Sequence, residues 1–469
     1  MGTAAVELMD HQREGIDFLV VGRNGLLAFE QGLGKTLVAI EAFRRVRLEG
    51  SADRLLVICP NSLKRNWVAE VEKFAPELTT EIIEGVPRHR RQRFLKTTAD
   101  VVITSYETGR TEVTAILALL TRKRTAMVLD ESHSAKTWRS QTSTAMRHFA
   151  PHCAFRWLLS GTPITNSPSD LYTQIEILAP GERRLGSMEV FLSDVENDPE
   201  SVRENVDSMV LRRTKEQCLD LPDKTFMDIR VELPAWQRKL YDDMRTEMVC
   251  ALQAMSGEEY RAFAATALAK LTRLSQIASN PALLFPAITD TSGKFEAMDG
   301  IVDDLMAVPD RKVIIWSNYV STIEHLLKRY AHHGAVALYG GIATTERQDI
   351  AKRFQTDTSV RVLIANPAAA GTGFTLTAAS FTIYETLSWR YDFYAQSQDR
   401  NHRIGQALPV TYLRMIAADT IEEAIIKALE RKSGMAGSLL GDEDAVPSVA
   451  ELTQEEMCSL ILHNKLPND

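Results

Sequence analysis

The first third of the chain contains short apolar runs at regular spacing. A run at residues 26–28 is followed by four more, which are β-branched or apolar almost throughout and occupy residues 55–59, 101–104, 126–129 and 157–159. Such runs are typical of strands covered on both faces of a parallel sheet. Each of these four runs ends in a polar or turn-forming group. Because ligands of open α/β sheets lie beyond the carboxyl ends of the strands, we expect these ends to share one edge.

A second series of the same kind follows further along the chain. Its strand-like runs occupy residues 312–316, 335–338, 362–364, 381–384 and 410–413. Between the two series, residues 234–280 carry apolar side chains at three- and four-residue spacings, which predicts helices. A further helix is expected over 421–431, with Asp419 or Thr420 as its cap. The pattern predicts an α/β protein in which one architecture is used twice.

Composition sets limits on the class of protein. With 469 residues the chain is too long for one typical core, so two or three domains are expected. A hydrophobic content of 45% and a charged content of 25% are those of an ordinary globular protein. The net charge of −8 gives no support for a strongly basic nucleic-acid binder, although binding depends on where Lys and Arg cluster.

Cysteine spacing and hydropathy indicate the compartment. The five cysteines show no C-x-x-C spacing, which argues against a zinc site and fits a reducing environment. No apolar run reaches membrane-spanning length, and residues 1–10 lack the basic-then-apolar pattern of a signal peptide. We therefore expect a cytoplasmic protein of bacterial or viral type, or a nuclear one if the source is eukaryotic, with no membrane partner.

The glycine-containing stretch at residues 28–36 lies where a strand turns into a helix. Backbone N–H groups freed by Gly32 and Gly34 can converge on phosphate oxygens, Lys35 adds charge, and the Thr36 hydroxyl can reach Mg²⁺. The full phosphate-loop pattern would place a glycine at Phe29, which this chain lacks. The stretch is therefore either a nucleotide-binding loop or an ordinary strand-to-helix turn.

Asp130 and Glu131 follow the apolar run at residues 126–129. A hydrolase acting on a magnesium nucleotide needs one carboxylate for the metal and a second that orients or deprotonates the attacking water. Two adjacent acids at a strand end supply both groups. The alternative is a pair of solvated acids that opens a loop.

Two further segments carry candidate chemistry. Arg400 and Arg403, three residues apart on a predicted helix, would share a face suited to gripping a triphosphate, or would form ordinary charge pairs on a solvated helix. Residues 8–15, which include Gln12, indicate a helix start with Asp10 as a plausible cap.

Taken together, these segments resemble a known family. Gln12, the glycine loop, and residues 130–133, 159–166, 211–215 and 396–406 occur in the order seen in Swi/Snf-type DNA-dependent ATPases of helicase superfamily two. The resemblance covers residues 5 to 432, and includes a DExH box. Details at residues 368–373 and at Glu422 resemble the annealing-helicase-like branch and compact microbial or viral members.

The resemblance implies a fold and a domain plan. The fold would be α/β, with two RecA-like parallel-sheet lobes and helical insertions between them. Lobe 1 would span residues 1–225, with a helical insertion over 168–215. A helical linker would follow over 226–300, lobe 2 would span 301–432, and 433–469 would form a tail.

The resemblance also implies an ATP site with Mg²⁺. Gln12 would read adenine, Asp130 and Thr36 would hold the metal, and Glu131 would be the general base. Arg400 and Arg403 would be arginine fingers, with Gln396 positioning water or phosphate. The remaining ATP-binding positions implied are Gly32, Leu33, Gly34, Lys35 and Gly373.

The implied partner is double-stranded DNA, contacted along its backbone. Such contacts position a protein without reading bases, so sequence specificity should be low. The implied contacts are Ser62, Lys64, Ser105, Tyr106 and Trp389, with Thr162 coupling ATP state to DNA. The basic residues 88–93 would either extend the DNA path or form a solvated helix face.

The chain departs from the family pattern at three places. Phe29 stands where the family usually has an acid, His133 follows Ser132 rather than Ala, and Thr372 replaces an apolar residue. We expect ATP hydrolysis to persist despite these departures, which bear instead on the coupling of hydrolysis to DNA.

We expect an ATP-dependent translocase on duplex DNA that remodels DNA or protein–DNA complexes, with targeting supplied by protein partners or by the tail. Two alternatives stay open. One is a helicase that separates or anneals DNA or RNA strands, and the other is a slow nucleic-acid-binding ATP switch within a larger complex. Nucleosomes, stalled forks, bound polymerases and invading DNA are all possible clients.

Overall fold

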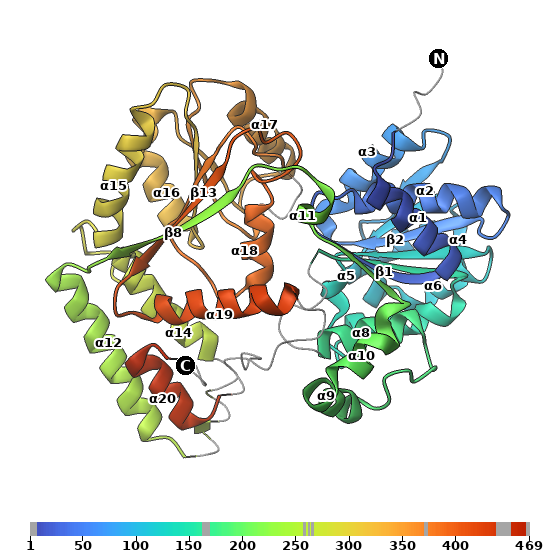
Figure 1. Cartoon of the computed structure of the whole chain (residues 1–469), viewed down its shortest axis with the longest axis horizontal. Helices are drawn as coiled ribbons and strands as arrows, with labels where there is room; N and C mark the ends of the chain where they lie inside the picture. Colours follow the sequence, from blue (N-terminus) through green and yellow to red (C-terminus); the bar gives the residue numbers. More distant parts are fainter. Residues whose placement is uncertain are drawn as a thin grey trace. The chain divides into compact units, whose positions relative to one another are not determined.

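The computed structural model describes residues 7–161, 169–256, 259–260, 263, 267–369, 374–437 and 452–465. It divides into two compact units. Among the described residues, the first contains those up to Asp220 together with 435–437, and the second contains the others from Leu221 on. Each unit is built on a parallel sheet flanked by helices (Figure 1). The prediction of an α/β protein with two parallel sheets is confirmed.

The sheet of the first unit has seven strands among the described residues, in the order β3-β4-β2-β5-β6-β1-β7. Every pairing is parallel. The strands are β1 (Asn24–Phe29), β2 (Arg54–Cys59), β3 (Thr80–Ile82), β4 (Val101–Ser105), β5 (Thr125–Asp130), β6 (Phe155–Leu159) and β7 (Val210–Arg213). The five apolar runs predicted at residues 26–28, 55–59, 101–104, 126–129 and 157–159 all lie in strands of this sheet.

Helices cover both faces of the first sheet. They are α1 (Asp10–Gly22), α2 (Lys35–Leu48), α3 (Lys64–Phe74), α4 (Pro87–Lys96), α5 (Tyr106–Thr111), α6 (Val113–Leu120), α7 (Gln141–Phe149), α8 (Ser169–Leu178), α9 (Met188–Asn197), α10 (Pro199–Asp207) and α11 (Lys215–Cys218). Short 3₁₀ turns are η1 (Asn61–Leu63), η2 (Ser132–Ala135) and η3 (Ala150–His152).

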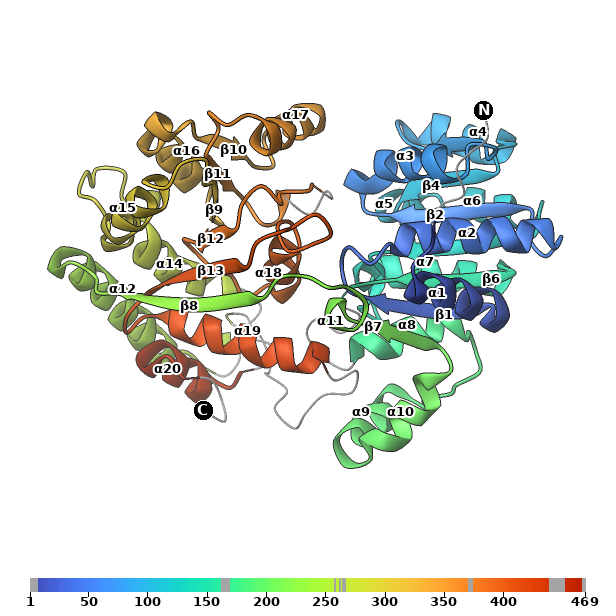
Figure 2. The same ribbon diagram turned by 45° about the horizontal axis from the view of Figure 1, so that its top comes forward.

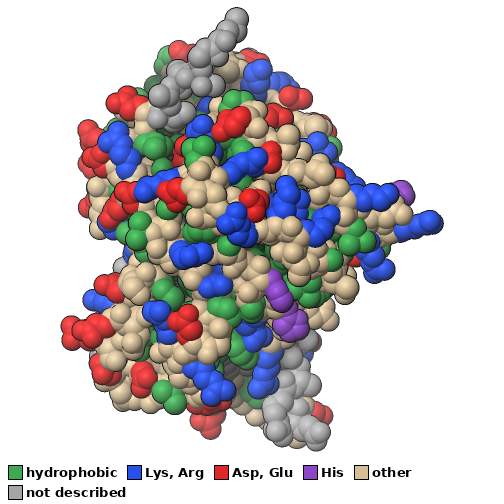
Figure 3. Space-filling model, turned by 90° about the vertical axis from the view of Figure 1, so that its right-hand side faces the viewer, with side chains coloured by type: hydrophobic (Ala, Val, Ile, Leu, Met, Phe, Trp, Pro, Cys, Tyr) green, Lys and Arg blue, Asp and Glu red, His purple; other side chains and the backbone are tan. Residues whose placement is uncertain are grey.

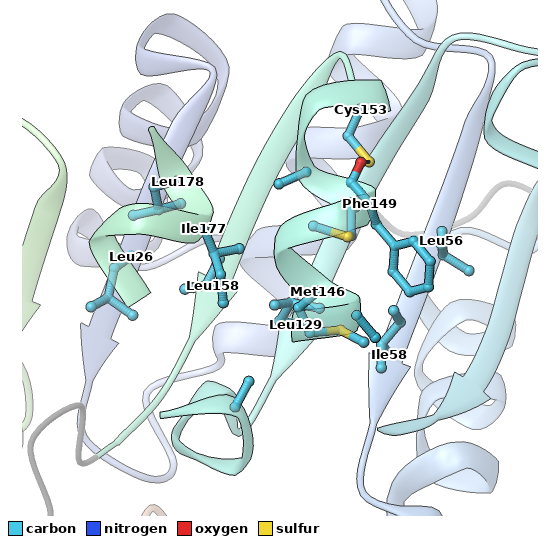
Figure 4. Packing of buried hydrophobic residues seen from close by; sticks show 14 of the residues in the cluster. Leu26, Leu56, Ile58, Leu129, Met146, Phe149, Cys153, Leu158, Ile177 and Leu178 are labelled. Atoms are coloured by element: carbon cyan, nitrogen blue, oxygen red, sulfur yellow. Dashed lines mark hydrogen bonds between the residues drawn. The ribbon is translucent and has the colours of Figure 1, made fainter. Parts of the chain in front are cut away.

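Alternate side chains of the central strands pack into two separate hydrophobic cores. In β2, Leu56 and Ile58 belong to the cluster under α7 and α8, whereas Leu55 and Val57 belong to the cluster under α1, α2 and α3. Figure 4 shows Phe149 of α7 close to Leu56 and Ile58. Successive side chains of a strand point to opposite faces of the sheet. Because both faces are covered here, almost every position of these strands is apolar.

The sheet of the second unit has six strands in the described residues, in the order β10-β11-β9-β12-β13-β8, again all parallel. They are β8 (Lys224–Val231), β9 (Val313–Trp316), β10 (Val336–Leu338), β11 (Val362–Ala365), β12 (Phe381–Tyr384) and β13 (Val410–Ala417). The five strand-like runs predicted for this part of the chain all lie in strands β9 to β13.

The helices of the second unit pack on its sheet and on one another. They are α12 (Ala235–Gln253), α14 (Ala267–Ser279), α15 (Gly293–Met306), α16 (Val320–Arg329), α17 (Thr344–Thr356), α18 (Tyr391–Gln398), α19 (Ile421–Gly437) and α20 (Gln454–His463), with the 3₁₀ turns η4 (Pro281–Leu283) and η5 (Ala331–His333). The helices predicted within 234–280 and over 421–431 are present.

One strand corrects the predicted domain plan. The helical linker expected over 226–300 begins with β8, which pairs with β13 from Lys224 opposite Val410 to Val231 opposite Ala417 (Figure 2). Most of β8 is exposed to solvent. An edge strand hydrogen-bonds on one side only and need not be apolar on both faces, so β8 carries no apolar run.

The segment expected as a tail includes part of the second unit's core. Met457, Leu460 and Ile461 of α20 are buried in one cluster with Tyr241 and Leu252 of α12. The Gln454 side chain donates to the Leu252 carbonyl, which ties α20 to the end of α12. Within the described residues, no helix is both long and apolar enough to cross a membrane.

A buried ionic group stabilises the second unit. The Nζ atom of Lys294 donates to Oε1 of Glu422 at 2.6 Å and to the Glu385 carbonyl at 2.7 Å, and Glu422 also accepts from the Ala417 amide at 2.9 Å. Both charged side chains are almost fully enclosed, at 0% and 4% exposed. Removing one partner would leave the other charge buried without compensation.

We therefore expect Lys294→Met to lower the free energy of unfolding of the second unit by about 3–5 kcal/mol. Burial raises the pKa of Glu422 and Lys294 opposes this rise, so the substitution raises that pKa further. The folded variant then favours the protonated form of Glu422. Its loss of unfolding free energy relative to the parent should therefore be larger at about pH 8 than at about pH 5.5. Hydrogen exchange of peptides from β12 and α19 measures this unit separately.

The matched control is Lys239→Met, which removes an exposed ion pair with Asp243 on α12. Exposed pairs contribute about 0–1 kcal/mol, so exchange should hardly change. Equal effects of the two substitutions would contradict a stabilising role for the buried pair.

Candidate functional site

The loop between β1 and α2 has the backbone of a phosphate-binding turn. Gly32 and Gly34 have φ angles of 91° and 83°, and α2 begins at Lys35 directly after Gly34. A Cβ atom on Gly34 would lie 2.5 Å from Nε2 of Gln12. Glycine is therefore required at residue 34 both by the left-handed backbone and by the neighbouring side chain.

Helix α1 holds this loop in place. His11 Nε2 lies 3.0 Å from the Leu33 carbonyl oxygen, and Gln12 Nε2 donates to the same oxygen at 3.4 Å. Oε1 of Gln12 accepts from the Met9 amide at 3.1 Å, so Gln12 caps α1 in place of the expected Asp10, which pairs with Arg13. Gln12 thus lies against the glycine loop, and its contact with adenine stays a prediction.

Lys35 folds back onto the loop. Its Nζ atom donates to the Phe29 carbonyl at 2.8 Å and to the Glu30 carbonyl at 3.4 Å, and its side chain is buried. Thr36, the next residue of α2, is half-buried. Phe29, where the family has an acid, is fully buried and packs edge-on against the His11 ring.

Asp130 is held at the end of β5 by a residue that sequence reasoning missed. Nε1 of Trp67, on α3, donates to Oδ2 of Asp130 at 2.7 Å, and the Glu131 amide donates to Oδ1 at 3.0 Å. Burial and the neighbouring Glu131 carboxylate raise the pKa of Asp130 to about 6, against the opposing effect of the Trp67 hydrogen bond and of Lys35. No sequence pattern links Trp67 to Asp130, because they are 63 residues apart.

Glu131 lies beside the glycine loop. Nε2 of Gln31 donates to its Oε1 at 2.6 Å, and His133 Nδ1 is 3.4 Å from its Oε2. Ser132, next in the chain, donates its hydroxyl to Gln174 of α8 at 2.6 Å. The strand order explains this proximity, because β6 alone separates β1 from β5 and the carboxyl ends of all three lie at one edge.

These groups suit a nucleoside triphosphate with a divalent cation. Left-handed glycines direct N–H groups outward at a helix N-terminus, where Lys35 supplies positive charge. The Thr36 hydroxyl and the Asp130 carboxylate are oxygen ligands of the kind that Mg²⁺ prefers. The glycine loop and the two acids are therefore brought together within the first unit.

The arginines of the second unit do not lie on a helix as predicted. Helix α18 contains Gln396, which is buried, and ends at Gln398, so Arg400 and Arg403 lie in the following turns. Beyond the helix end, the Arg400 carbonyl accepts from the Leu376 amide at 2.8 Å and the Asn401 carbonyl from the Gln406 side chain at 3.0 Å, so both carbonyls bond outside a helical ladder. Arg400 is buried and Arg403 is half-buried.

Most residues implied as DNA contacts have partners inside the protein. Lys64 is buried and pairs with Glu84, and the Ser105 hydroxyl accepts from the Thr108 amide to cap α5. The Tyr106 hydroxyl donates to the Asp130 carbonyl at 2.9 Å, and burial raises the pKa of this phenol.

The other implied DNA contacts differ in exposure. Ser62 is exposed after β2, whereas Trp389 is partly buried against two hydrophobic clusters of the second unit. Thr162, Thr372 and Gly373 lie outside the described residues. The implied DNA contacts stay predictions, as does the implied contact of Gly373 with ATP.

The basic stretch at residues 88–93 forms most of α4. Arg90 and Arg91 both pair with Glu112, and Arg93 pairs with Glu81, while Arg88 is exposed. These pairs favour the interpretation of α4 as a solvated helix face. On the face shown in Figure 3, Lys and Arg side chains are widely distributed and Asp and Glu side chains gather toward the left edge.

Two family models match most of the chain. Residues 11–283 match the SNF2-related domain, and residues 293–405 match the helicase conserved C-terminal domain. The chain is 29% identical over 470 residues to an uncharacterized ATP-dependent helicase of Mycoplasma pneumoniae, covering 97% of this chain and 44% of that protein.

Other relatives show the same pattern of coverage. Identity is 28% to the putative ATP-dependent helicase/translocase YwqA of Bacillus subtilis, covering 97% of this chain and 51% of the relative. It is 26% to the human DNA annealing helicase and endonuclease ZRANB3, covering 92% and 40%. The chain thus spans about half or less of the length of these relatives.

A solved structure, the Sulfolobus solfataricus SWI2/SNF2 ATPase core in complex with dsDNA, is 26% identical, with coverage of 98% of this chain and 97% of that chain and a TM-score of 0.44. The two family models, lying in sequence order, confirm the resemblance drawn from the motifs. The chain therefore belongs to the SNF2-related family, with a helicase C-terminal domain following the SNF2-related domain.

Proposed function

We propose that this protein is a DNA-dependent ATPase that translocates along double-stranded DNA. The observation that carries the proposal is the arrangement in the first unit, where the Lys35 loop, Asp130 and Glu131 lie at one edge of a parallel sheet. Family membership supports ATP as the nucleotide, since two of the relatives are described as ATP-dependent helicases or translocases.

In this proposal the first unit binds ATP and activates water. Gln12 contacts adenine, and the N–H groups of Gly32, Leu33 and Gly34 bind phosphate together with Lys35. Thr36 and Asp130 hold Mg²⁺, which supplies charge neutralisation at the phosphates. Glu131 accepts the proton of the attacking water as general base.

Three residues of the second unit carry further proposed roles. Arg400 and Arg403 stabilise the charge that develops on the γ-phosphate, and Gln396 positions water or phosphate. These assignments rest on the match of their positions to the family motif, and all three residues lie within residues 293–405, which match the helicase C-terminal model. ATP-driven changes of conformation would then shift the protein along the duplex.

Duplex DNA is the proposed partner, bound through its backbone with low sequence specificity. Similarity to a relative described as a DNA annealing helicase supports DNA as the nucleic acid and keeps strand annealing as a second candidate. The ATPase rate should rise strongly with duplex DNA and less with single-stranded DNA or RNA. Triplex displacement without strand displacement would identify a translocase, whereas strand separation or annealing would identify the helicase alternative.

The first prediction from the proposed function concerns Glu131 as the general base. Glu131→Gln should leave ATP affinity nearly unchanged and lower the DNA-stimulated turnover number at least about 100-fold, because the amide cannot accept a proton. Phosphate release and binding of a fluorescent ATP analogue measure the two quantities. Glu107→Gln, at an exposed position of α5, is the control and should keep the parent rate. Substantial remaining turnover in Glu131→Gln would rule out this role.

The second prediction concerns the arginine finger. Arg403→Ala should lower the turnover number by about 1,000-fold and change ATP affinity much less, because a finger acts on charge that develops in the transition state. Arg353→Ala, at an exposed position of α17, should have little effect. A turnover number in Arg403→Ala equal to that of the parent would count against the finger.

The third prediction concerns the pH dependence of ATP hydrolysis. Trp67→Phe removes the hydrogen bond that favours the charged form of Asp130, so the pKa of Asp130, already raised to about 6, should rise further. Since the metal requires the carboxylate, the acid limb of kcat/KM should move up by about one pH unit.

The control for this shift is Trp157→Phe in β6. Trp157 is as buried as Trp67, but its Nε1 donates at 3.1 Å to the Leu19 carbonyl and not to a carboxylate. This variant should therefore keep the parent pH profile. A common shift in both variants would mean that general loosening of the core, and not Asp130, causes it.

A further inference from the structure

One hydrogen bond joins the glycine loop directly to the proposed general base. Gln31, the residue before Gly32, donates from Nε2 to Oε1 of Glu131 at 2.6 Å, across 100 residues of sequence. Its side chain packs over Gly161, where an added Cβ would lie 3.2 Å from both Cγ and Nε2 of Gln31. The lack of a side chain at residue 161 gives the Gln31 amide its place beside Glu131.

The Glu131 side chain is largely enclosed in this arrangement, at 13% exposed. One oxygen is engaged by Gln31, and the other, Oε2, is buried with His133 Nδ1 3.4 Å away. Glu131 also has a φ angle of 51°, a left-handed backbone that is unfavourable for a residue with a Cβ atom. A general base must bring an oxygen within hydrogen-bond distance of the water that it deprotonates. The hydrogen bond from Gln31 therefore competes with water for one of the two oxygens that could act as the base.

The same loop would sense the nucleotide. In this structure Lys35 Nζ bonds to the carbonyls of Phe29 and Glu30, which are the two residues before Gln31. Phosphate oxygens would compete for that ammonium group, so nucleotide binding changes the hydrogen bonding directly beside Gln31. A link therefore runs from phosphate through Lys35 and Gln31 to Glu131.

We propose that Gln31 is a positioning residue that holds Glu131 in a resting orientation, and that release of this hydrogen bond precedes efficient hydrolysis. The proposal rests on the proposed function, in which Glu131 is the general base. It assigns to Gln31 a role in keeping turnover low while this hydrogen bond is in place.

The test is Gln31→Met, which keeps the length of the side chain and removes the amide donor. Without DNA, the ATPase rate of this variant should rise by about tenfold, in line with the loss of a hydrogen bond to a charged group. With saturating duplex, its rate should equal that of the parent, so stimulation by DNA falls by the same factor. Gln141→Met, the same change at an exposed position of α7, should leave both rates unchanged.

Two further variants separate positioning from a general effect on the loop. Gln31→Asn keeps the amide but is too short to reach Glu131, and should raise the DNA-free rate as Gln31→Met does. The double variant Gln31→Met with Glu131→Gln should be as inactive as Glu131→Gln alone, because the gain must act through the carboxylate.

The outcomes divide cleanly. The proposal would be overturned if the ATPase rate without DNA stayed unchanged in both Gln31 variants. It would also be overturned if that rate fell, whether or not ATP affinity fell with it. If the parent hydrolyses ATP without stimulation by duplex, the translocase function fails, but a faster Gln31→Met still supports the restraint on Glu131. If neither parent nor variant hydrolyses ATP, both proposals fail.

Discussion

The central strands of both sheets are buried on both faces, and the rest of the structure depends on this constraint. A parallel strand covered on two sides is apolar at most successive positions, and its polar groups gather where the strand ends. In the first unit β1, β5 and β6 are adjacent and run in the same direction. Their carboxyl ends therefore place the glycine loop, Asp130 and Glu131, and Gly161 at one edge.

At that edge, the polar groups that follow the strands bond to partners within the protein. Lys35 is bonded to backbone carbonyls, Asp130 to Trp67, and Glu131 to Gln31. In a region of low dielectric constant, each of these bonds is stronger than it would be in water, and each fixes the orientation of a charged group. The chemistry of the site is thus set as much by these partners as by the charged residues themselves.

The second unit uses the same sheet architecture with a different polar interior. Lys294 connects Glu422 of α19 to the end of β12, while the Glu385 carboxylate accepts from Ser279, Ser317 and Thr386. Helix α20 completes the hydrophobic cluster around α12. The described residues 418–434 and 452–465 are therefore part of the folded second unit.

The sequence by itself determined the central strands, the glycine loop and the adjacent acids, because local composition is enough where a strand is buried on both faces or a turn needs glycine. The family followed from the order of these motifs. Edge strands such as β8 escaped detection, since a strand paired on one side can be polar and exposed. Arg400 and Arg403, predicted on a helix, lie beyond the end of α18, where the Arg400 carbonyl accepts from the distant Leu376 amide and the Asn401 carbonyl from the Gln406 side chain. The partners Trp67 and Gln31 were likewise decided only by the tertiary structure, because residues 63 and 100 positions apart meet through strand order and not through any local pattern.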